Sequence, residues 1–152
     1  MPRTVWVVLI LLALLLAGCS AQGQLGSRAA QYYSFMAGHN PKMQLSSFYS
    51  PAYRGLFKRD ALKQMDSAIK PGAQAGGRYP EAKPSDVAVN VQGRFALTTA
   101  NPGLGTVYAT QDATKWVHVG LRWYLYLGSQ AEVKAYGPFP VGMKRPQYKP
   151  AS

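Results

Sequence analysis

The feature that most constrains this chain is its amino-terminal apolar segment. Arg3 supplies a positive charge, residues 5–16 form an almost unbroken apolar run, and Leu16-Ala17-Gly18-Cys19 closes it with small residues and a cysteine. A charged start, a short apolar stretch and a small-residue end are typical of an export signal that is removed. A run of about a dozen residues is too short for a hydrocarbon core, which needs roughly 20 helical residues. The sequence therefore predicts that residues 1–18 are an export signal and not a structural helix.

Cys19, the single cysteine of the chain, points to a more specific kind of signal. The Leu16-Ala17-Gly18-Cys19 sequence resembles the lipobox of bacterial lipoprotein signal peptides. The resemblance implies that Cys19 is acylated on its thiol, becomes the first residue after cleavage, and is acylated again on its new amino group. Two or three acyl chains, such as palmitate, hold a protein at a membrane almost permanently. Ser20 stands where an aspartate would imply inner-membrane retention, so an outer-membrane anchor facing the periplasm is expected. An ordinary membrane anchor with an incidental cysteine is the alternative.

The composition of the remaining chain, about 134 residues, is that of one strongly basic domain. Removal of the signal takes away Arg3 alone, which lowers the formal net charge from +11 to +10. A positive surface favours anionic partners, so we expect an envelope protein or an anionic envelope polymer, with a homodimer also open. The exported location argues against nucleic acid. Because no second cysteine exists, disulfides and thiolate metal sites are excluded.

Helical patterns occupy the first part of the mature chain. Residues 19–26 are small and polar, which predicts a flexible tether. Beyond them, apolar residues repeat at spacings of three and four, and glycine or proline follows each predicted helix end. The predicted helices are 28–37, 42–49 and the strongly amphipathic 53–69, whose apolar stripe is Leu56, Phe57, Ala61, Met65 and Ile69.

After Pro84 the apolar period becomes two, which indicates strands. Gly93 separates the first two of them. The predicted strands are 87–92, 95–99, 106–110, 115–127 and 131–136. Residues 137–152 are proline-rich and basic, and we expect a tail that runs over the surface or is loose.

The stretch 115–127 predicts the longest strand, with a clean core face. That face consists of Val117, Val119, Leu121, Trp123, Leu125 and Leu127. We expect Leu121 and Trp123 to be buried beneath the helix that carries Phe57, Met65 and Ile69. Gly120 lies inside the strand, where glycine often marks a bulge, and a bulge would exchange the two faces beyond it.

Helices followed by antiparallel strands predict an α+β fold, with one domain over residues 27–136. The order resembles the NTF2-like superfamily, a cone of helices packed on a curved antiparallel sheet. The residues that carry the resemblance are the aromatic first helix (QYYSFMAGHN, 31–40), the junction at 48–51, the amphipathic helix 53–69 and the glycine-kinked strand around Trp123. The resemblance implies a pocket at the open end of the cone. A plain helix-on-sheet sandwich is the alternative.

Catalytic signals are weak throughout the sequence. Enzymes of the NTF2-like superfamily place a His, Asp or Tyr in the pocket, and the candidates here are His118 and, more weakly, Asp86, Asp112, His39 and the tyrosines. No carboxylate near His118 in sequence orients its ring. We find no metal-ligand spacing, no phosphate-binding glycine loop and no nucleophile elbow. The expectation is a non-catalytic protein without metal or cofactor.

A surface is the stronger functional candidate. The second face of the 115–127 strand combines aromatic and basic groups, which are enriched in interface cores. Its residues are Trp116, His118, Arg122, Tyr124 and Tyr126. The alternative is that the helices or the carboxy-terminal tail cover this face. We therefore expect a lipid-anchored binding or assembly module, with a small-ligand carrier or enzyme using the cone pocket as the alternative function.

Overall fold

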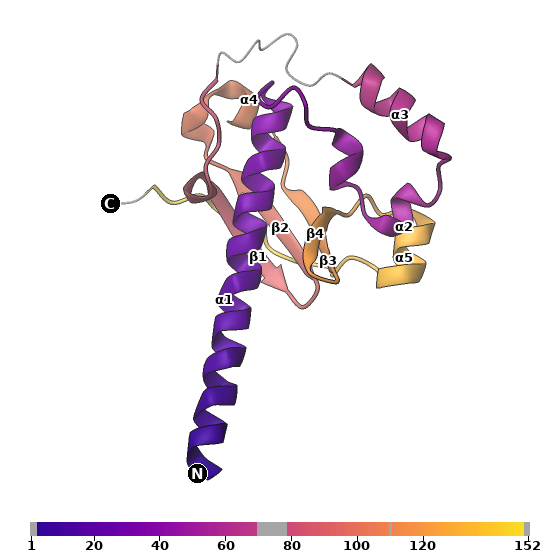
Figure 1. Ribbon diagram of the computed structural model, residues 1–152. Helices are drawn as coiled ribbons and strands as arrows, with labels where there is room; N and C mark the ends of the chain where they lie inside the picture. Colours follow the sequence, from indigo (N-terminus) through magenta and orange to yellow (C-terminus); the bar gives the residue numbers. More distant parts are fainter. Residues whose placement is uncertain (1–2, 70–78, 110, 151–152) are drawn as a thin grey trace.

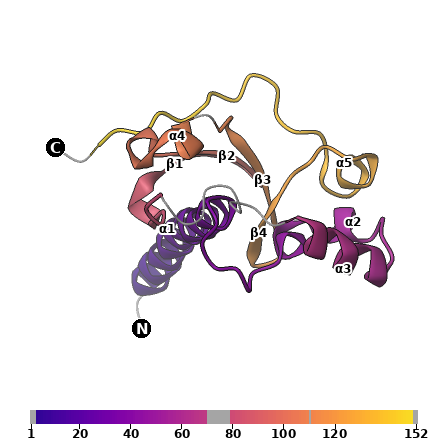
Figure 2. The same cartoon turned by 90° about the horizontal axis from the view of Figure 1, so that it is seen from above.

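A four-stranded antiparallel sheet and a long helix organise the computed structural model, which describes residues 3–69, 79–109 and 111–150. The strands lie in chain order and are β1 (Val87–Gln92), β2 (Phe95–Ala100), β3 (Thr114–Val119) and β4 (Arg122–Leu125). Helix α1 (Arg3–Met36) covers one face of the sheet, here called the inner face, and the carboxy-terminal tail crosses the opposite, outer face (Figures 1 and 2). The α+β prediction is confirmed.

Helix α1 continues through the predicted tether. Residues 19–26 are helical, and Leu25 is already fully buried. Leu25, Ala29 and Tyr33 follow one another at the four-residue spacing of a helix face, and all three are buried in the core. The prediction of a flexible tether is therefore wrong, because the apolar face of the helix begins inside it. In the described part of the chain, no helix combines the length and hydropathy needed to cross a membrane.

The other predicted helices are shorter than expected. The second is one turn of 3-10 helix, η1 (Leu45–Phe48), and the third is divided into α2 (Pro51–Arg54) and α3 (Arg59–Ala68). Ser50 caps α2 by accepting the Tyr53 N–H at 3.2 Å, with Pro51 at the first helical position. Gly55 ends this short helix. Helix α3 packs on η1 and has no fully buried residue, so the predicted cover of Trp123 comes from α1 instead.

The predicted long strand is a hairpin. Residues 120 and 121 form a two-residue turn between β3 and β4, and Gly120 has φ = +62°. A glycine with positive φ at the first turn position is typical of type II′ hairpins. Trp123 is buried, with 2% of its surface exposed, as predicted, whereas Leu121 is 86% exposed at the tip. The burial predicted for Leu121 is wrong because the chain reverses there.

Two further predicted strands are helices. Residues 106–109 form α4 (Thr106–Ala109), while residue 110 lies outside the described part, and 130–136 form α5 (Gln130–Tyr136). Ser129 and Glu132 make a capping box at the start of α5, in which each side chain accepts the other residue's backbone N–H. This local capping favours a helix over the predicted strand. The β1–β2 hairpin at Gly93 is confirmed.

The sheet is buried on both faces. On the inner face, aromatic rings from α1, η1 and the sheet pack together, among them Tyr33, Phe48, Trp116 and Trp123. On the outer face, Phe139 of the tail contacts the rings of Phe95 and Tyr126 at centroid distances of 5.4 and 5.6 Å. Asn90 and Thr99 donate to the backbone carbonyls of Lys144 and Pro146, which align the tail with the sheet. The tail is therefore a second layer of the fold.

Candidate functional site

The five residues predicted to form one partner surface lie on two faces of the β3–β4 hairpin. Trp116 and His118 are on the inner face, and Trp116 is fully buried beneath α1. Tyr126 is buried on the outer face against the tail. Tyr124 is half-buried and Arg122 is exposed. The turn at residues 120 and 121 explains this separation. Residues that face one another across an antiparallel pair share a face, and Trp116 pairs with Leu125 whereas Tyr124 pairs with Val117.

The side chains predicted as catalytic candidates make structural contacts. His39 bonds through Nε2 to the Tyr79 carbonyl at 2.6 Å. Asp86 accepts the Lys83 N–H at 2.9 Å and the Asn101 side-chain amide at 3.2 Å. His118 stacks on Trp123 with a ring-centroid distance of 4.8 Å, and its buried Nε2 atom has no hydrogen-bond partner among the described residues. Asp112 is exposed, between α4 and β3, and the structure brings none of these four groups into a catalytic pair.

The structure instead gathers arginines around the edge strand β4. Arg28 of α1, Arg54 of α2 and Arg122 of β4 are close enough for their charges to interact. The Arg28 guanidinium lies 4.3 Å from the centre of the Phe48 ring and donates to the Ser47 carbonyl. The Arg54 guanidinium lies 5.6 Å from the centre of the Tyr124 ring. We call Arg28, Arg54 and Arg122 the arginine cluster.

The arginine cluster lacks an acidic counterpart. Burial lowers the pKa of Arg28, and the charges of Arg122 and Arg54 lower it further, while Tyr124 raises it. Among the described residues, no carboxylate forms an ion pair with any of the three guanidinium groups. The Nε atom of Arg28 is buried and has no hydrogen-bond partner in the same part of the chain. An anion placed between these groups would relieve their mutual repulsion.

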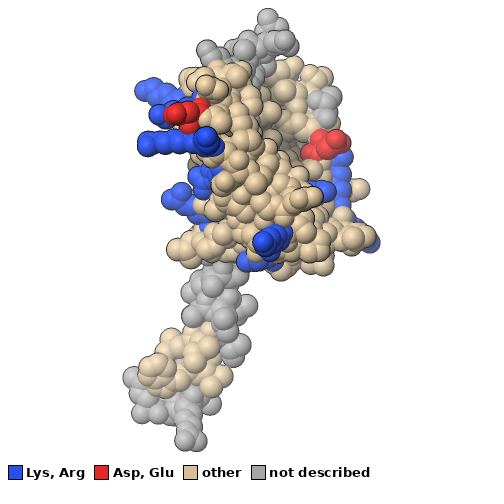
Figure 3. Space-filling view, turned by 90° about the vertical axis from the view of Figure 1, so that its right-hand side faces the viewer, with Lys and Arg blue, Asp and Glu red and all other residues tan. Residues whose placement is uncertain are grey.

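A hollow of about 200 Å³ opens beside the cluster, between α1 and the β3–β4 hairpin. It is lined by Gln24, Arg28, Leu121, Arg122 and Trp123. Figure 3 shows Lys and Arg side chains at both ends of the domain, and those at the end from which α1 emerges have no acidic side chain beside them on this face. Guanidinium groups bind carboxylate and phosphate oxygens in a bidentate geometry, so this hollow suits an anionic group.

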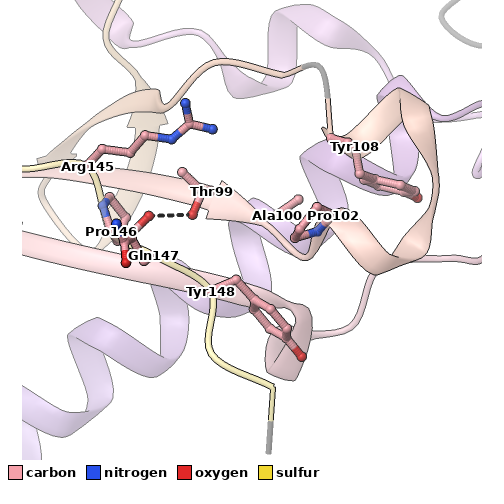
Figure 4. Close-up of a pocket in the computed structure, with 9 residues that line it drawn as sticks. Thr99, Ala100, Pro102, Tyr108, Arg145, Pro146, Gln147 and Tyr148 are labelled. Atoms are coloured by element: carbon pink, nitrogen blue, oxygen red, sulfur yellow. Dashed lines mark hydrogen bonds between the residues drawn. The ribbon is translucent and has the colours of Figure 1, made fainter.

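A larger cavity of about 310 Å³ lies under the tail, beside β2 and α4 (Figure 4). Its walls are Thr99, Ala100, Pro102, Tyr108, Ala109, Arg145, Pro146, Gln147 and Tyr148. Thr99 bonds to Pro146, Tyr108 donates to the Pro80 carbonyl at 2.7 Å, and Arg145 donates to the Gln111 carbonyl at 3.2 Å. These nine lining residues include no carboxylate, histidine or cysteine. With one cation and no carboxylate, histidine or cysteine in its lining, the cavity suits ligand binding better than acid–base chemistry.

The one buried carboxylate of the described chain, Glu132, is used by the fold. It accepts the Ser50 hydroxyl at 2.6 Å, the Leu127 N–H at 3.1 Å and the Ser129 N–H at 3.0 Å. These bonds join the start of α5 to the start of α2. A carboxylate enclosed by this many donors has no free position for a substrate.

Sequence reasoning missed two members of the arginine cluster, Arg28 and Arg54. A signal was present, because no Asp or Glu occurs before Asp60 and none occurs between Asp112 and Glu132. These two carboxylate-free stretches supply all three arginines. The three arginines come together at β4 only because the chain reverses at residues 120 and 121, and the predicted strand 115–127 contained no such turn.

No group of three or more His, Cys, Asp or Glu side chains in the described part of the chain is placed to hold a metal ion. Comparisons of this chain with protein-family models, with curated proteins and with solved structures gave no match. The function is therefore argued from the geometry of the arginine cluster and its position relative to Cys19.

Proposed function

We propose that this chain is a lipid-anchored protein of the cell envelope whose domain binds an anionic partner and catalyses no reaction. Acyl chains on Cys19 would hold it, with Ser20 favouring the outer membrane and a domain that faces the periplasm. The observation that carries the proposal is the continuity of α1 from the lipobox into the core. The Cys19 side chain itself is outside the part of the structure described.

The continuity of α1 sets the distance between anchor and domain. Leu25, the first buried residue among the α1 side chains that the structure describes, follows Cys19 by six residues, or about 9 Å at 1.5 Å per helical residue. A flexible tether would allow the domain to move freely over the membrane. A helix of this length holds one end of the domain near the membrane surface, which supports a role that depends on position.

The arginine cluster supports binding as that role. Two of the three arginines, Arg28 and Arg122, line a hollow whose lining includes no carboxylate, and the chain as a whole carries a formal net charge of +11. Such a surface attracts anionic envelope polymers, acidic proteins or lipid headgroups. Arg122 and Tyr124, two members of the predicted partner surface, belong to this region, so the surface hypothesis is kept in a revised form.

A finer fold assignment accompanies this proposal. We propose an NTF2-like cone, because the amino-terminal helices pack on the inner face of an antiparallel sheet. Aromatic rings fill the inner face, which supports a binding role on the outside of the cone. The alternative function, a small-ligand carrier or enzyme, is favoured by the cavity under the tail.

Affinity capture of the mature protein from its own membranes tests the function. Wild type is compared with Arg28→Gln/Arg122→Gln and with the charge-matched control Arg59→Gln/Lys63→Gln, which alters two exposed residues of α3. We expect the cluster variant to lose a co-purifying component, or a homodimer seen by sedimentation, that the control keeps. Equal retention by all three proteins would contradict binding at the arginine cluster. A fourth variant, Tyr148→Ala, alters the cavity under the tail, and loss of the component in that variant alone would favour the ligand-carrier alternative.

A further inference from the structure

We propose that the arginine cluster binds the phosphate group of an anionic phospholipid in the membrane that holds Cys19. The inference rests on the proposed anchoring of Cys19 and names the ligand of the proposed binding surface. In this arrangement, the domain lies with its α1-exit end on the lipid headgroups. The acyl chains and the arginine cluster then form two separate contacts with one membrane.

The position of the arginine cluster supports this ligand. The tips of both hairpins lie at the end of the domain from which α1 emerges (Figure 1). Arg28 follows Cys19 by nine residues, about 14 Å along a helix. The headgroup layer extends roughly 5–8 Å beyond the hydrocarbon, and charges act over about a further 8 Å at physiological salt. The arginine cluster is therefore within electrostatic reach of the headgroups, and a tilt of α1 would bring it into contact.

The chemistry of the hollow matches a phosphodiester. Arg28 and Arg122 lie on its two sides, one from the helix and one from the hairpin, so both can donate to the same anion. Arginine is preferred for phosphate because its planar donors match two oxygens at once.

Leu121 favours a lipid over a soluble anion. It lines the same hollow and is 86% exposed at the hairpin tip, directly before Arg122 in the chain. An exposed large apolar side chain beside basic groups is typical of surfaces that lie at the headgroup–acyl boundary. A soluble phosphate or a sugar acid would gain nothing from Leu121, whereas a bilayer accommodates both the charge and the apolar tip.

Fluorescence of the lipidated protein in nanodiscs tests the proposal. Leu121→Trp introduces a reporter at the hairpin tip, against a background of Trp116 and Trp123, which are both buried. The discs contain phosphatidylglycerol or phosphatidylcholine with brominated acyl chains, which quench a nearby tryptophan. We expect strong quenching and a blue-shifted emission in phosphatidylglycerol and little change in phosphatidylcholine. Higher salt should weaken the quenching.

Variants of the arginine cluster provide the decisive comparison. Arg28→Gln/Arg122→Gln in the Leu121→Trp background should lower the docked-to-free ratio by about 30-fold, since each basic group at an anionic surface contributes roughly a factor of five. Arg59→Gln/Lys63→Gln removes the same charge from α3 and should leave quenching unchanged. Equal quenching in both lipids, or no difference between the two variants, would overturn the headgroup site while the protein stays in the disc. Failure of the protein to co-purify with discs would overturn the anchoring proposal as well.

Discussion

At the scale of single residues, the most constrained group is the Glu132 carboxylate, which is fully buried. Its oxygens accept hydrogen bonds from Ser50, Leu127 and Ser129. Glu132→Gln replaces one acceptor oxygen by an NH₂ group that faces donors. We expect the free energy of unfolding to fall by about 1.5–3 kcal/mol, the range for hydrogen bonds to a charged group. Urea unfolding of this variant measures the loss, and the exposed Glu81→Gln should change stability by less than about 0.5 kcal/mol.

The β3–β4 hairpin supplies a second residue-scale contrast. Trp123 is buried beneath α1, whereas Leu121, two positions earlier, is exposed. Trp123→Ala should lower the free energy of unfolding by about 3–5 kcal/mol, because it opens a large cavity in the core. Leu121→Ala should change it by less than about 0.5 kcal/mol. Thermal unfolding of both variants checks this, and a large loss for Leu121→Ala would restore a continuous strand through Gly120.

At the scale of elements, two glycines have opposite conformational requirements. Gly120 has φ = +62° in the hairpin turn, while Gly23 lies inside helix α1, and a Cβ at either position would meet no atom within 4 Å. Gly120→Ala should destabilise the protein by about 1–2 kcal/mol, since a Cβ disfavours positive φ. Gly23→Ala should stabilise the helix by up to about 1 kcal/mol. Circular dichroism during thermal unfolding should show Tm shifts of opposite sign, and equal shifts would contradict the turn.

The sequence predicted elements well where one local signal dominated. The β1–β2 hairpin followed from alternation on both sides of Gly93, and the helix over 28–37 followed from its apolar spacing. The hairpin at Gly120 was missed because Val119, Leu121 and Trp123 keep the alternation of a single strand across the turn. Helix α5 was predicted as a strand because apolar residues follow Ser129 and Glu132. The capping box that these two residues form favours a helix over that strand.

The candidate site was predictable only in part, because it is assembled by tertiary structure. The alternation along 115–127 correctly placed Arg122 and Tyr124 in the candidate site. It also placed Trp116 and Tyr126 there, but these two side chains belong to the cores on opposite faces of the sheet. Periodicity assigns residues to the two faces of a sheet only when the strand register is known. The turn at residues 120 and 121 exchanged the faces of the residues that follow it. The covering of the outer face by the tail depends on Phe139, whose ring partners Phe95 and Tyr126 lie on two different strand segments. No local pattern contains that information.

At the scale of the whole molecule, a single helix joins the core to the two proposed membrane contacts. Helix α1 carries the proposed acylation site Cys19, the buried face built on Leu25, Ala29 and Tyr33, and the Arg28 side chain of the arginine cluster. The proposed anchoring and headgroup binding would thereby lie on the same helix as the core contacts. Both proposals require that acylated Cys19 anchors helix α1 to the membrane.

Metabolic labelling with palmitate, followed by intact-mass analysis of wild type and Cys19→Ser, is the most direct test of that claim. Wild type should take up the label, and its mature chain should begin at Cys19 with added acyl mass. Cys19→Ser should remain an unlabelled precursor with residues 1–18 attached. A Cys19→Ser protein that is processed and labelled like wild type would contradict it.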